Sequence, residues 1–235
     1  MRKRLPVRFP GKTEGVKSMN ELLLCPSMMC ADFDHLADDV KKLDAAGADI
    51  FHCDIMDGTY VPNMTLGLQD VRCIRRNTGK PVDAHLMVEN PSRLLQLYLD
   101  AGCDLIYLHA DSDRYVGKAL LQIRQAGRKS GLVLNPDESP ESARELFPLA
   151  DYVMLMTVYP GFAGQKYLEH VTDKLKRLMP YKEQYGFKVT IDGACSPEKI
   201  RELSAIGADG FILGTSALFG KPGTYAEILR RLRSE

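Results

Sequence analysis

The chain lacks an excess of charge of either sign, and it lacks any long apolar run. Lys plus Arg and Asp plus Glu both number 31, so net charge gives no reason to expect nucleic acid or an anionic membrane as a partner. No apolar stretch approaches the roughly 20 residues that cross a bilayer. We therefore expect a soluble protein that binds neither nucleic acid nor membrane.

Paired cysteine motifs are also missing. The six cysteines form no C-x-x-C pair, and several lie inside apolar runs that are typical of strands or helices. In a chain without an export signal, this usage is typical of reduced core residues. We therefore expect a cytoplasmic location.

Residues 1–20 differ from the rest of the chain. They hold six basic side chains, one acid and two prolines without periodicity, and only Leu22-Leu23-Leu24 resembles the apolar core of a signal peptide. We predict a flexible basic tail, with Met19 as the working start; an oligomer-contact arm is the alternative. With 45% hydrophobic residues, the chain is long enough for one large domain, over residues 21–235.

One pattern recurs four times: a helix-like stretch, usually Gly, then Asp, then an apolar run. Its copies are AAGADIFHCDI (45–55), DAGCDLIYLH (100–109), PLADYVMLMT (148–157) and AIGADGFILG (205–214). Glycine just past a helix adopts the left-handed conformation at little cost, so each copy predicts a helix followed by a strand. Four more strand-length apolar runs occur at 22–26, 81–87, 131–134 and 187–191.

Helical spacing of apolar residues occurs between these predicted strands. The segments include 34–46, 92–101, 115–126, 139–146, 167–185 and 197–206. Strands that alternate with helices imply parallel pairing, and eight such units in about 215 residues predict a single (β/α)8 TIM barrel. A doubly wound open sheet is the alternative, but no glycine fingerprint follows the first strand.

Polar residues follow the predicted strands, where a barrel of this kind carries its chemistry. In chain order they are Ser27, His52 with Asp54, His85, His109, Asn135, TVYPGFAGQ (157–165), Asp192-Gly193 and Gly214-Thr215-Ser216. A random scatter of polar residues would not sort in this way.

Two histidines and two aspartates in this set predict a metal site. His52 and Asp54 lie two residues apart in a strand, so both point to one face, and His85 and Asp192 end nearby strands. Imidazole with carboxylate suits a divalent transition metal, which would offset the cost of burying two carboxylates. We predict one divalent ion per subunit at these residues, with Zn the first choice and Mn, Co and Fe as alternatives. For any single histidine, a hydrogen-bonded core position is the alternative.

The other histidines receive different interpretations. His35 precedes or begins a helix and His170 lies within one, so we expect both at the surface. His109 ends a strand but has no carboxylate two residues away, and it stays unassigned. Asp57 falls in the loop beyond its strand, so we do not expect it to be catalytic.

Glycine-rich loops follow predicted strands six, seven and eight. They are PGFAG (160–164), the turn at Gly193, and Gly214-Thr215-Ser216. Backbone N–H groups in such loops, with a short helix N-terminus, form the phosphate site common in these barrels. We therefore expect a small phosphorylated ligand, held without Lys or Arg from these loops; plain tight turns are the alternative.

Seven segments resemble the ribulose-phosphate 3-epimerase family, in order and across nearly the whole chain after residue 21. They are CPSMMCADF, HCDIMDGTYVPNMTLG, DAHLMV, LVLNP, MTVYPGFAGQ, IDGAC and GTSALF. Met156-Thr157-Val158, Ala163, Cys195 and Gly214-Thr215-Ser216 resemble the D-allulose-6-phosphate 3-epimerase branch. Two positions depart from the family pattern: Tyr159, where Asn or Asp is common, and Ala194, where Gly or Ser is usual.

The resemblance implies a metal-dependent epimerase with its catalytic domain at 21–235, assembled as a homo-oligomer, either dimer or hexamer. It implies that His52, Asp54, His85 and Asp192 hold the metal and that Asp54 and Asp192 are the acid/base groups. It implies substrate contacts at Ser27, His85, Gly161, Phe162, Ala163, Gly164, Asp192, Gly193, Ala194, Gly214, Thr215 and Ser216.

The chemistry of a 3-epimerase fits two carboxylates and a metal. A proton leaves C3, beside the C2 ketone, and one returns to the opposite face, so two carboxylates that flank a flat enediolate divide the work. A metal at the oxygens of C2 and C3 stabilises the developing negative charge. Met56, Met87 and Met156, near three strand ends, are candidates to cap the enediolate, with core packing as the alternative.

We expect D-allulose 6-phosphate as the substrate and D-fructose 6-phosphate as the product. D-ribulose 5-phosphate, converted to D-xylulose 5-phosphate, is the alternative substrate. A metal-free phosphate-binding barrel, either a decarboxylase or a non-catalytic binder, is the alternative from a different class.

Overall fold

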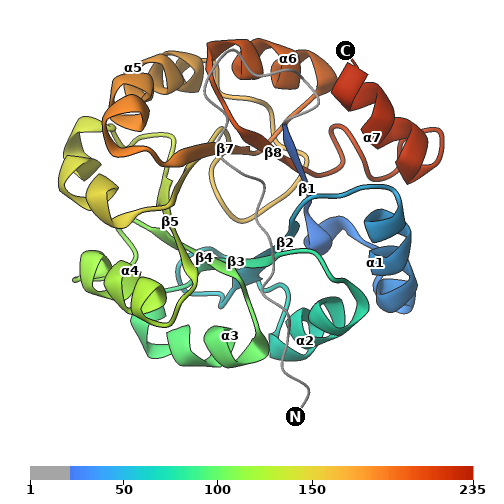
Figure 1. Cartoon of the computed structure of the whole chain (residues 1–235), viewed down its shortest axis with the longest axis horizontal. Coiled ribbons are helices and arrows are strands. Elements are labelled where there is room, and N and C mark those ends of the chain that lie inside the picture. The colour runs from blue at the N-terminus through green and yellow to red at the C-terminus, as the bar shows by residue number, and fades with distance from the viewer. Residues whose placement is uncertain (1–21, 235) are drawn as a thin grey trace.

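The chain forms a barrel of eight parallel strands inside a ring of helices (Figure 1). The computed structural model describes residues 22–234, so the predicted tail at 1–20 lies outside the described residues. The strands are Leu23–Pro26 (β1), Phe51–Met56 (β2), Val82–Met87 (β3), Leu105–His109 (β4), Lys129–Leu134 (β5), Tyr152–Met156 (β6), Lys188–Asp192 (β7) and Gly210–Leu213 (β8). The prediction of a single (β/α)8 TIM barrel is confirmed.

The first six α-helices lie in connections between strands, and the seventh follows β8. They are Leu36–Ala45 (α1), Leu68–Asn77 (α2), Leu95–Ala101 (α3), Val116–Gln125 (α4), His170–Tyr185 (α5), Pro197–Ile206 (α6) and Tyr225–Ser234 (α7). Short 3-10 helices cover Met28–Cys30 (η2), Phe33–His35 (η3), Pro91–Arg93 (η4) and Glu141–Leu149 (η5). No helix within residues 22–234 combines the length and the apolar character needed to cross a membrane.

The observed helices differ from the predicted ones in the fifth connection and in two added elements. The segment predicted as a helix at 139–146 forms η5, a 3-10 helix over Glu141–Leu149 that contains Pro148. Helices α2 and α7 were absent from the predicted set. In both, charged and polar residues outnumber the buried apolar ones, which are Val71 and Ile74 in α2 and Ile228, Leu229 and Leu232 in α7.

The barrel closes between its first two strands. Hydrogen-bonded ladders run from β2 through β3 to β8 and on to β1, all of them parallel. A parallel bridge between Ser27 and His52 and a hydrogen bond from Asp49 N–H to the Leu24 carbonyl, 3.0 Å long, join β1 to β2. The closure therefore sets the end of β1 beside the strand that carries His52.

Two large apolar cores and a small third cluster of Met56, Val61 and Met87 fill the molecule. One lies between the strands and the helices and includes Cys53, and the other fills the barrel and includes Tyr107. Gly131 on β5 makes room for the Tyr107 ring, since a Cβ there would lie 2.2 Å from its Cδ1 atom. The Tyr107 hydroxyl crosses the barrel to Thr190, 3.1 Å away on β7. Tyr107 thus fills the barrel interior from one wall to the other.

The aspartate of the recurring sequence pattern makes the same kind of hydrogen bond in all four copies. In each copy it lies just before an even-numbered strand and accepts the N–H of the first or second residue of the preceding odd-numbered strand. The pairs are Asp49 with Leu24, Asp104 with Val82, Asp151 with Ser130 and Asp209 with Val189, at 2.5 to 3.1 Å. We call these four contacts the aspartate latches.

Each latch is also charge-balanced by basic side chains. Asp104, which is 4% exposed, pairs with Arg75 at 2.7 Å and with Arg128 at 2.9 Å. Arg233, Lys129 and Lys182 pair with the other three aspartates at 2.6 to 2.8 Å. The cations offset the desolvation of the carboxylates at this end of the barrel.

We expect Asp104→Ala to lower the free energy of unfolding by about 3–5 kcal/mol, because it removes the buried carboxylate that lies 2.7 Å from the Arg75 guanidinium. Arg128→Ala is the matched control. It removes the second ion pair of the Asp104 carboxylate. Because the Arg128 side chain is 34% exposed, we expect the free energy of unfolding to fall by less than about 1 kcal/mol. Equilibrium urea unfolding measures both, and equal losses would contradict the role of the latch.

A clamp of charged groups holds the chain where it leaves β5. The Lys174 ammonium donates to the carbonyls of Asn135 at 2.6 Å and Pro136 at 2.7 Å, and the Glu138 carboxylate accepts the Asn135 N–H at 2.7 Å. Burial lowers the pKa of Lys174 to about 8 and raises the pKa of Glu138 to about 7. The clamp fixes the backbone of Asn135.

We expect Glu138→Gln to raise the melting temperature at pH 8 and to leave it unchanged at pH 4.5. The folded pKa of Glu138, about 7, lies above the unfolded value of 4.5, so protonation favours folding and this stability is lost as the pH rises through 7. Glutamine mimics the protonated acid. After solvent screening we expect a gain on the order of 1 kcal/mol, or roughly 2–4 °C.

Asp137→Asn is the control for this titration, because it removes the same charge from an exposed neighbour. It should shift the melting temperature equally little at both pH values. A Glu138→Gln variant with the same gain at pH 4.5 and pH 8 would show that burial of this carboxylate does not oppose folding.

Candidate active site

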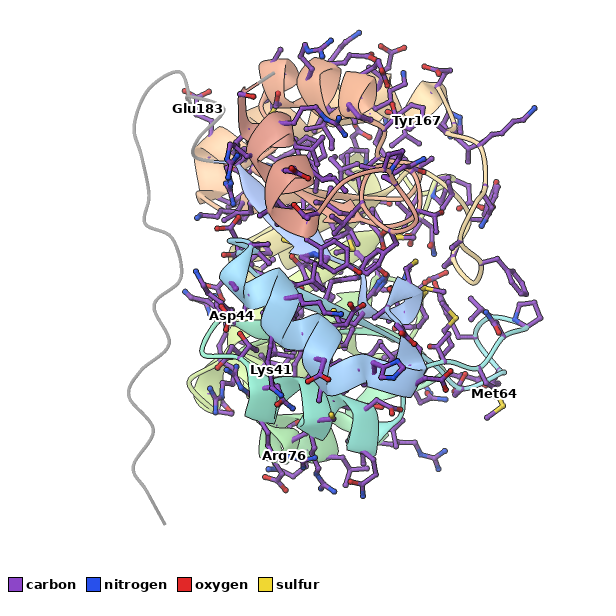
Figure 2. All side chains as sticks on the ribbon, turned by 90° about the vertical axis from the view of Figure 1, so that its right-hand side faces the viewer. Lys41, Asp44, Met64, Arg76, Tyr167 and Glu183 are labelled. Atoms are coloured by element: carbon purple, nitrogen blue, oxygen red, sulfur yellow. The ribbon has the colours of Figure 1, made fainter. Side chains whose placement is uncertain are left out.

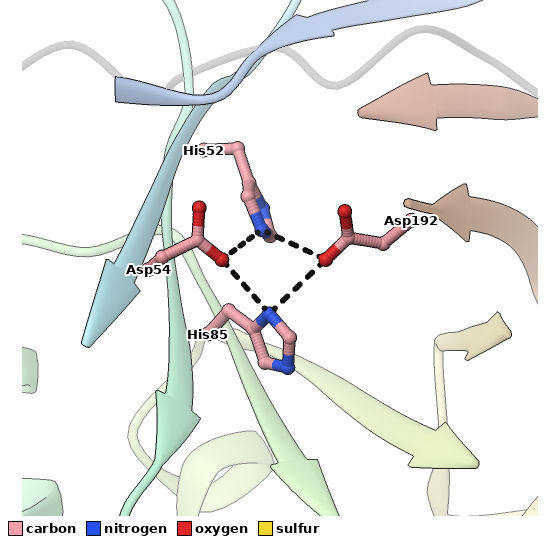
Figure 3. A group of neighbouring side chains, drawn as sticks. All are labelled: His52, Asp54, His85 and Asp192. Atoms are coloured by element: carbon pink, nitrogen blue, oxygen red, sulfur yellow. Dashed lines mark hydrogen bonds and ion pairs between the residues drawn. The ribbon is translucent and has the colours of Figure 1, made fainter. Parts of the chain in front are cut away.

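Four side chains from β2, β3 and β7 converge at the mouth of the barrel (Figure 3). They are His52, Asp54, His85 and Asp192, and one nitrogen or oxygen of each lies within 4.8 Å of all the others. Asp54 stands opposite His85 in the β2–β3 ladder, which places the two side chains on one face. The structure therefore brings together the four residues that the sequence predicts as a cluster.

The spacing of these atoms fits a bound divalent ion. Oδ1 of Asp54 lies 3.2 Å from Nε2 of His52 and 3.2 Å from Nδ1 of His85, and Oδ2 of Asp192 lies 3.8 and 3.5 Å from the same nitrogens. Ligands about 2.1 Å from a tetrahedral zinc ion lie about 3.4 Å apart. Two carboxylates with two neutral imidazoles also match the charge of a divalent cation.

Burial and charge act in opposite directions on the ionisable groups of the cluster. Burial disfavours a charged His52, but the carboxylates of Asp83 and Asp54 outweigh it and raise the pKa of His52. Burial also disfavours an ionised Asp54, yet His52 and His85 hold its pKa well below the ordinary range. Asp54 therefore stays ionised, as a metal ligand or a base requires.

Asp83 is a member of the site that sequence reasoning missed. Its Oδ1 lies 2.8 Å from Nδ1 of His52, and both side chains are buried. Burial raises the pKa of Asp83, while His52 acts against this rise. The sequence held a signal for it, because Asp83 precedes His85 by two residues in the same way that His52 precedes Asp54.

His109, unassigned from the sequence, lies directly behind His85. The two Nε2 atoms are 2.8 Å apart, and the rings stack with an interplanar angle of 19°. Burial lowers the pKa of His109 well below its usual value, and charge on His85 would lower it further. His35 and His170 are exposed, so the prediction that both lie at the surface is confirmed.

A cavity of about 570 Å³, partly open to solvent, lies over the cluster. Every predicted substrate-contact residue except His85 lines it, and so do Met56, Met87 and Met156. Asp54 and eight further residues complete the lining: Met29, Cys30, Val158, Tyr159, Pro160, Gln165, Cys195 and Ile212. The wall contains no Lys or Arg among the described residues, so an anion here would rely on backbone N–H groups and hydroxyls.

The glycine-rich loops take shapes that their sequence allows. Gly193 has a φ of +108°, and a Cβ there would lie 2.6 Å from Val158, so only glycine fits. Ala194 follows with a φ of +47°, a left-handed conformation that glycine adopts more easily.

The loops after β2 and β6 meet above the cavity. The Asn63 side-chain amide donates to the Gly161 carbonyl at 2.6 Å. Figure 2 shows Met64, on the first of these loops, projecting from one end of the barrel, while Asp44 and Glu183, near the ends of α1 and α5, lie toward the other. The cavity and the aspartate latches therefore occupy opposite ends of the barrel.

Comparison with known proteins gives a consistent result. Residues 23–219 match the model of the Ribulose-phosphate 3 epimerase family. A ribulose-phosphate 3-epimerase of Escherichia coli (strain K12) is 37% identical over 221 residues, which cover 92% of this chain and 97% of that protein. Another, from Aquifex aeolicus, is 36% identical over 214 residues, covering 90% and 96%.

Solved structures with lower identity share the fold. A 3-hexulose-6-phosphate synthase aligns with a TM-score of 0.65 at 17% identity, covering 91% of this chain and 99% of that one. A 3-keto-L-gulonate-6-phosphate decarboxylase from Vibrio cholerae aligns with a TM-score of 0.66 at 16% identity, covering 91% and 98%. The family match and the identities to curated relatives go further than the fold: the chain belongs to the ribulose-phosphate 3-epimerase family.

Proposed function

We propose that this protein is a metal-dependent 3-epimerase of ketose phosphates. The observation that carries the proposal is the meeting of two carboxylates and two imidazoles beneath a cavity walled by glycine-rich loops. Membership of the ribulose-phosphate 3-epimerase family supports the same reaction. A metal-free phosphate-binding barrel would not account for two carboxylates and two imidazoles grouped as metal ligands are.

The positions of the two carboxylates support a role in proton transfer at opposite faces of a planar substrate. Asp54 comes from β2 and Asp192 from β7, and they approach the cluster from opposite sides (Figure 3). One removes the proton from C3 and the other returns a proton to the opposite face, with the enediolate lying between them. A bound divalent ion at His52, Asp54, His85 and Asp192 supplies Lewis-acid stabilisation of the developing negative charge.

Neighbouring side chains orient the carboxylates and exclude water. The Ser27 hydroxyl donates to Oδ2 of Asp54 at 2.7 Å, which leaves Oδ1 turned toward the histidines. Met56, Met87 and Met156 are buried and line the cavity, where thioether side chains can cover a flat intermediate. We propose that these three methionines cap the enediolate.

The phosphate group would lie against the loops after β6, β7 and β8. Gly161 to Gly164, Gly193-Ala194 and Gly214 to Ser216 line one continuous cavity with the metal cluster. Without a cationic side chain in that wall, backbone N–H groups would carry the binding. The arrangement suits a short phosphorylated ketose whose C2 and C3 reach the cluster.

We propose D-allulose 6-phosphate as the preferred substrate, on the resemblance of Thr157, Ala163 and Cys195 to that branch of the family. The Thr157 hydroxyl donates to the carbonyls of Asp192 and Gly193. A serine would make the same hydrogen bonds, so Thr157 alone does not select the substrate. The names of the curated relatives favour D-ribulose 5-phosphate as the second candidate.

Two wider properties accompany this proposal. The six free thiols are those of a protein kept in a reducing cytoplasm. The family resemblance favours a homo-oligomer, dimer or hexamer, whose size gel filtration with light scattering would measure.

We expect kcat/KM for D-allulose 6-phosphate to exceed that for D-ribulose 5-phosphate by roughly tenfold or more, since a selective cavity must respond to one added carbon. Coupled assays of both sugars with one preparation of enzyme measure the ratio. A preference for the pentose phosphate would replace the first substrate with the second and would leave the reaction class intact.

We expect Asp192→Asn to lower kcat by roughly 100- to 10,000-fold, because the amide keeps the shape of the side chain but cannot exchange the proton. Asp57→Asn is the control. The Asp57 carboxylate accepts backbone N–H groups in the loop beyond β2 and should tolerate the change with activity retained.

Elemental analysis accompanies these assays. The wild type should contain about one divalent ion per chain, and chelation should abolish turnover. Full activity after complete removal of metal, or normal turnover by Asp192→Asn, would overturn the two-base, metal-dependent mechanism.

A further inference from the structure

A row of polar side chains runs from the candidate metal centre to the surface, on the side of His85 away from the cluster. Its members are His109 at the end of β4, Asn135 just after β5, Tyr60 in the loop after β2 and Asp111 in the loop after β4. His109 and Asn135 are buried, whereas Asp111 is exposed. The mechanism above assigns none of them a role.

Hydrogen-bond distances connect His85 to His109 at one end of the row, and Asn135, Tyr60 and Asp111 to one another at the other end. Nε2 of His85 lies 2.8 Å from Nε2 of His109. At the other end, the Asn135 amide nitrogen lies 2.8 Å from the Tyr60 hydroxyl and 3.2 Å from Oδ2 of Asp111, and the Tyr60 hydroxyl donates to Oδ1 of Asp111 at 2.7 Å. The Tyr60 ring packs against the His109 ring, 4.9 Å between centroids.

The middle link follows by elimination. Nδ1 of His109 and Oδ1 of Asn135 are both buried, and neither makes a hydrogen bond of good geometry to any group within residues 22–234. The Asn135 side chain raises the pKa of His109, against the larger lowering effect of burial, so the two side chains are close enough to interact. Since Nε2 of His109 faces His85 and Nδ2 of Asn135 faces Tyr60, these two atoms are each the available partner of the other.

The direction of every hydrogen bond in the row follows from its last member. The carboxyl oxygens of Asp111 accept, so the Tyr60 hydroxyl donates to Oδ1 and itself accepts from the Asn135 amide nitrogen. Oδ1 of Asn135 is then the acceptor that faces His109, which must carry its proton on Nδ1. This leaves a lone pair on Nε2 of His109.

That lone pair determines the tautomer of His85. Two Nε2 atoms 2.8 Å apart need one proton between them, and it belongs to His85 if His109 is protonated on Nδ1. Nδ1 of His85 is then left with a lone pair that points at the cluster. A histidine ligand of a metal ion needs this state, and its other nitrogen is ordinarily held by such a partner.

The competing tautomer would block the site. Nδ1 of His85 lies 3.2 Å from Oδ1 of Asp54 and 3.5 Å from Oδ2 of Asp192, so a proton on Nδ1 would gain hydrogen bonds to carboxylates. Such a proton would occupy the position of the ion. A fixed acceptor on the far side of the ring opposes that outcome.

We propose that His109 and Asn135 are positioning residues that hold His85 in its Nε2–H tautomer and thereby keep its Nδ1 available to a divalent ion. The inference rests on the proposed metal site, and it adds two residues that do not touch the ion. It also distinguishes the two histidine ligands, because His52 is held by the carboxylate of Asp83 and His85 by neutral partners.

Nitrogen chemical shifts test the tautomers directly. The chain has five histidines, so long-range ¹H–¹⁵N spectra of the zinc-loaded enzyme, labelled with ¹⁵N-histidine, can be assigned by single substitutions. We expect His109 protonated on Nδ1 and His85 protonated on Nε2. In Asn135→Leu the His109 signals should move toward the other tautomer. Observation of His109 protonated on Nε2 in the wild type would overturn the proposal.

Zinc affinity gives the second readout, measured by competition with a chromophoric chelator and without any assay of activity. We expect His109→Leu to bind zinc about 10- to 100-fold more weakly. His109→Gln is the matched control, because its amide oxygen can accept from His85 while its amide nitrogen donates to Asn135, so it should retain most of the affinity. Circular dichroism of both variants checks that the barrel is folded.

The outcomes separate the two proposals. If the wild type binds no zinc stoichiometrically, the proposed metal-dependent function fails and this inference fails with it. If the wild type binds zinc and His109→Leu binds it equally well, the metal site stands and the positioning role of His109 is wrong.

Discussion

The structure depends on how two carboxylates can be buried side by side at the mouth of an apolar barrel. Asp54 is nearly inaccessible and Asp192 is 14% exposed, and each lies within 4 Å of the same two imidazoles. Such a pair is stable only when positive charge and hydrogen bonds compensate for lost solvation. His52 and His85 provide part of that compensation, and behind them Asp83 and His109 hold the rings. The site therefore extends one layer deeper than its candidate ligands.

Much of this arrangement could be predicted because it follows from local periodicity. The fourfold pattern of a helix-like stretch, Gly, Asp and an apolar run predicted four of the strands. The two-residue spacing of His52 and Asp54 predicted that both lie on one face. The closure of a parallel barrel then brings strand ends together whatever their separation in sequence, which is why Asp192 could be added to the cluster.

The parts that could not be predicted depend on contacts between strands. The importance of His109 comes from its stacking on His85 across the β3–β4 ladder, and a sequence gives no register for that pair. Asp83 was missed for a different reason. Its two-residue spacing from His85 is visible in the sequence, but its role depends on contact with His52 on the neighbouring strand, which only the structure shows. Helix α2 was not predicted because Arg75 occupies a buried position beside Val71 and Ile74 and interrupts the apolar face of the helix. In the fold, Arg75 pairs with Asp104.

The aspartate latches divide the barrel into four modules, β1–β2, β3–β4, β5–β6 and β7–β8, each fastened at the end farthest from the cavity. His52 and Asp54 belong to the first module, His85 to the second and Asp192 to the fourth. A single ion held by these side chains would therefore link three of the four modules at the cavity end of the barrel. Metal binding would then stabilise that end of the barrel in the same step that completes the active site.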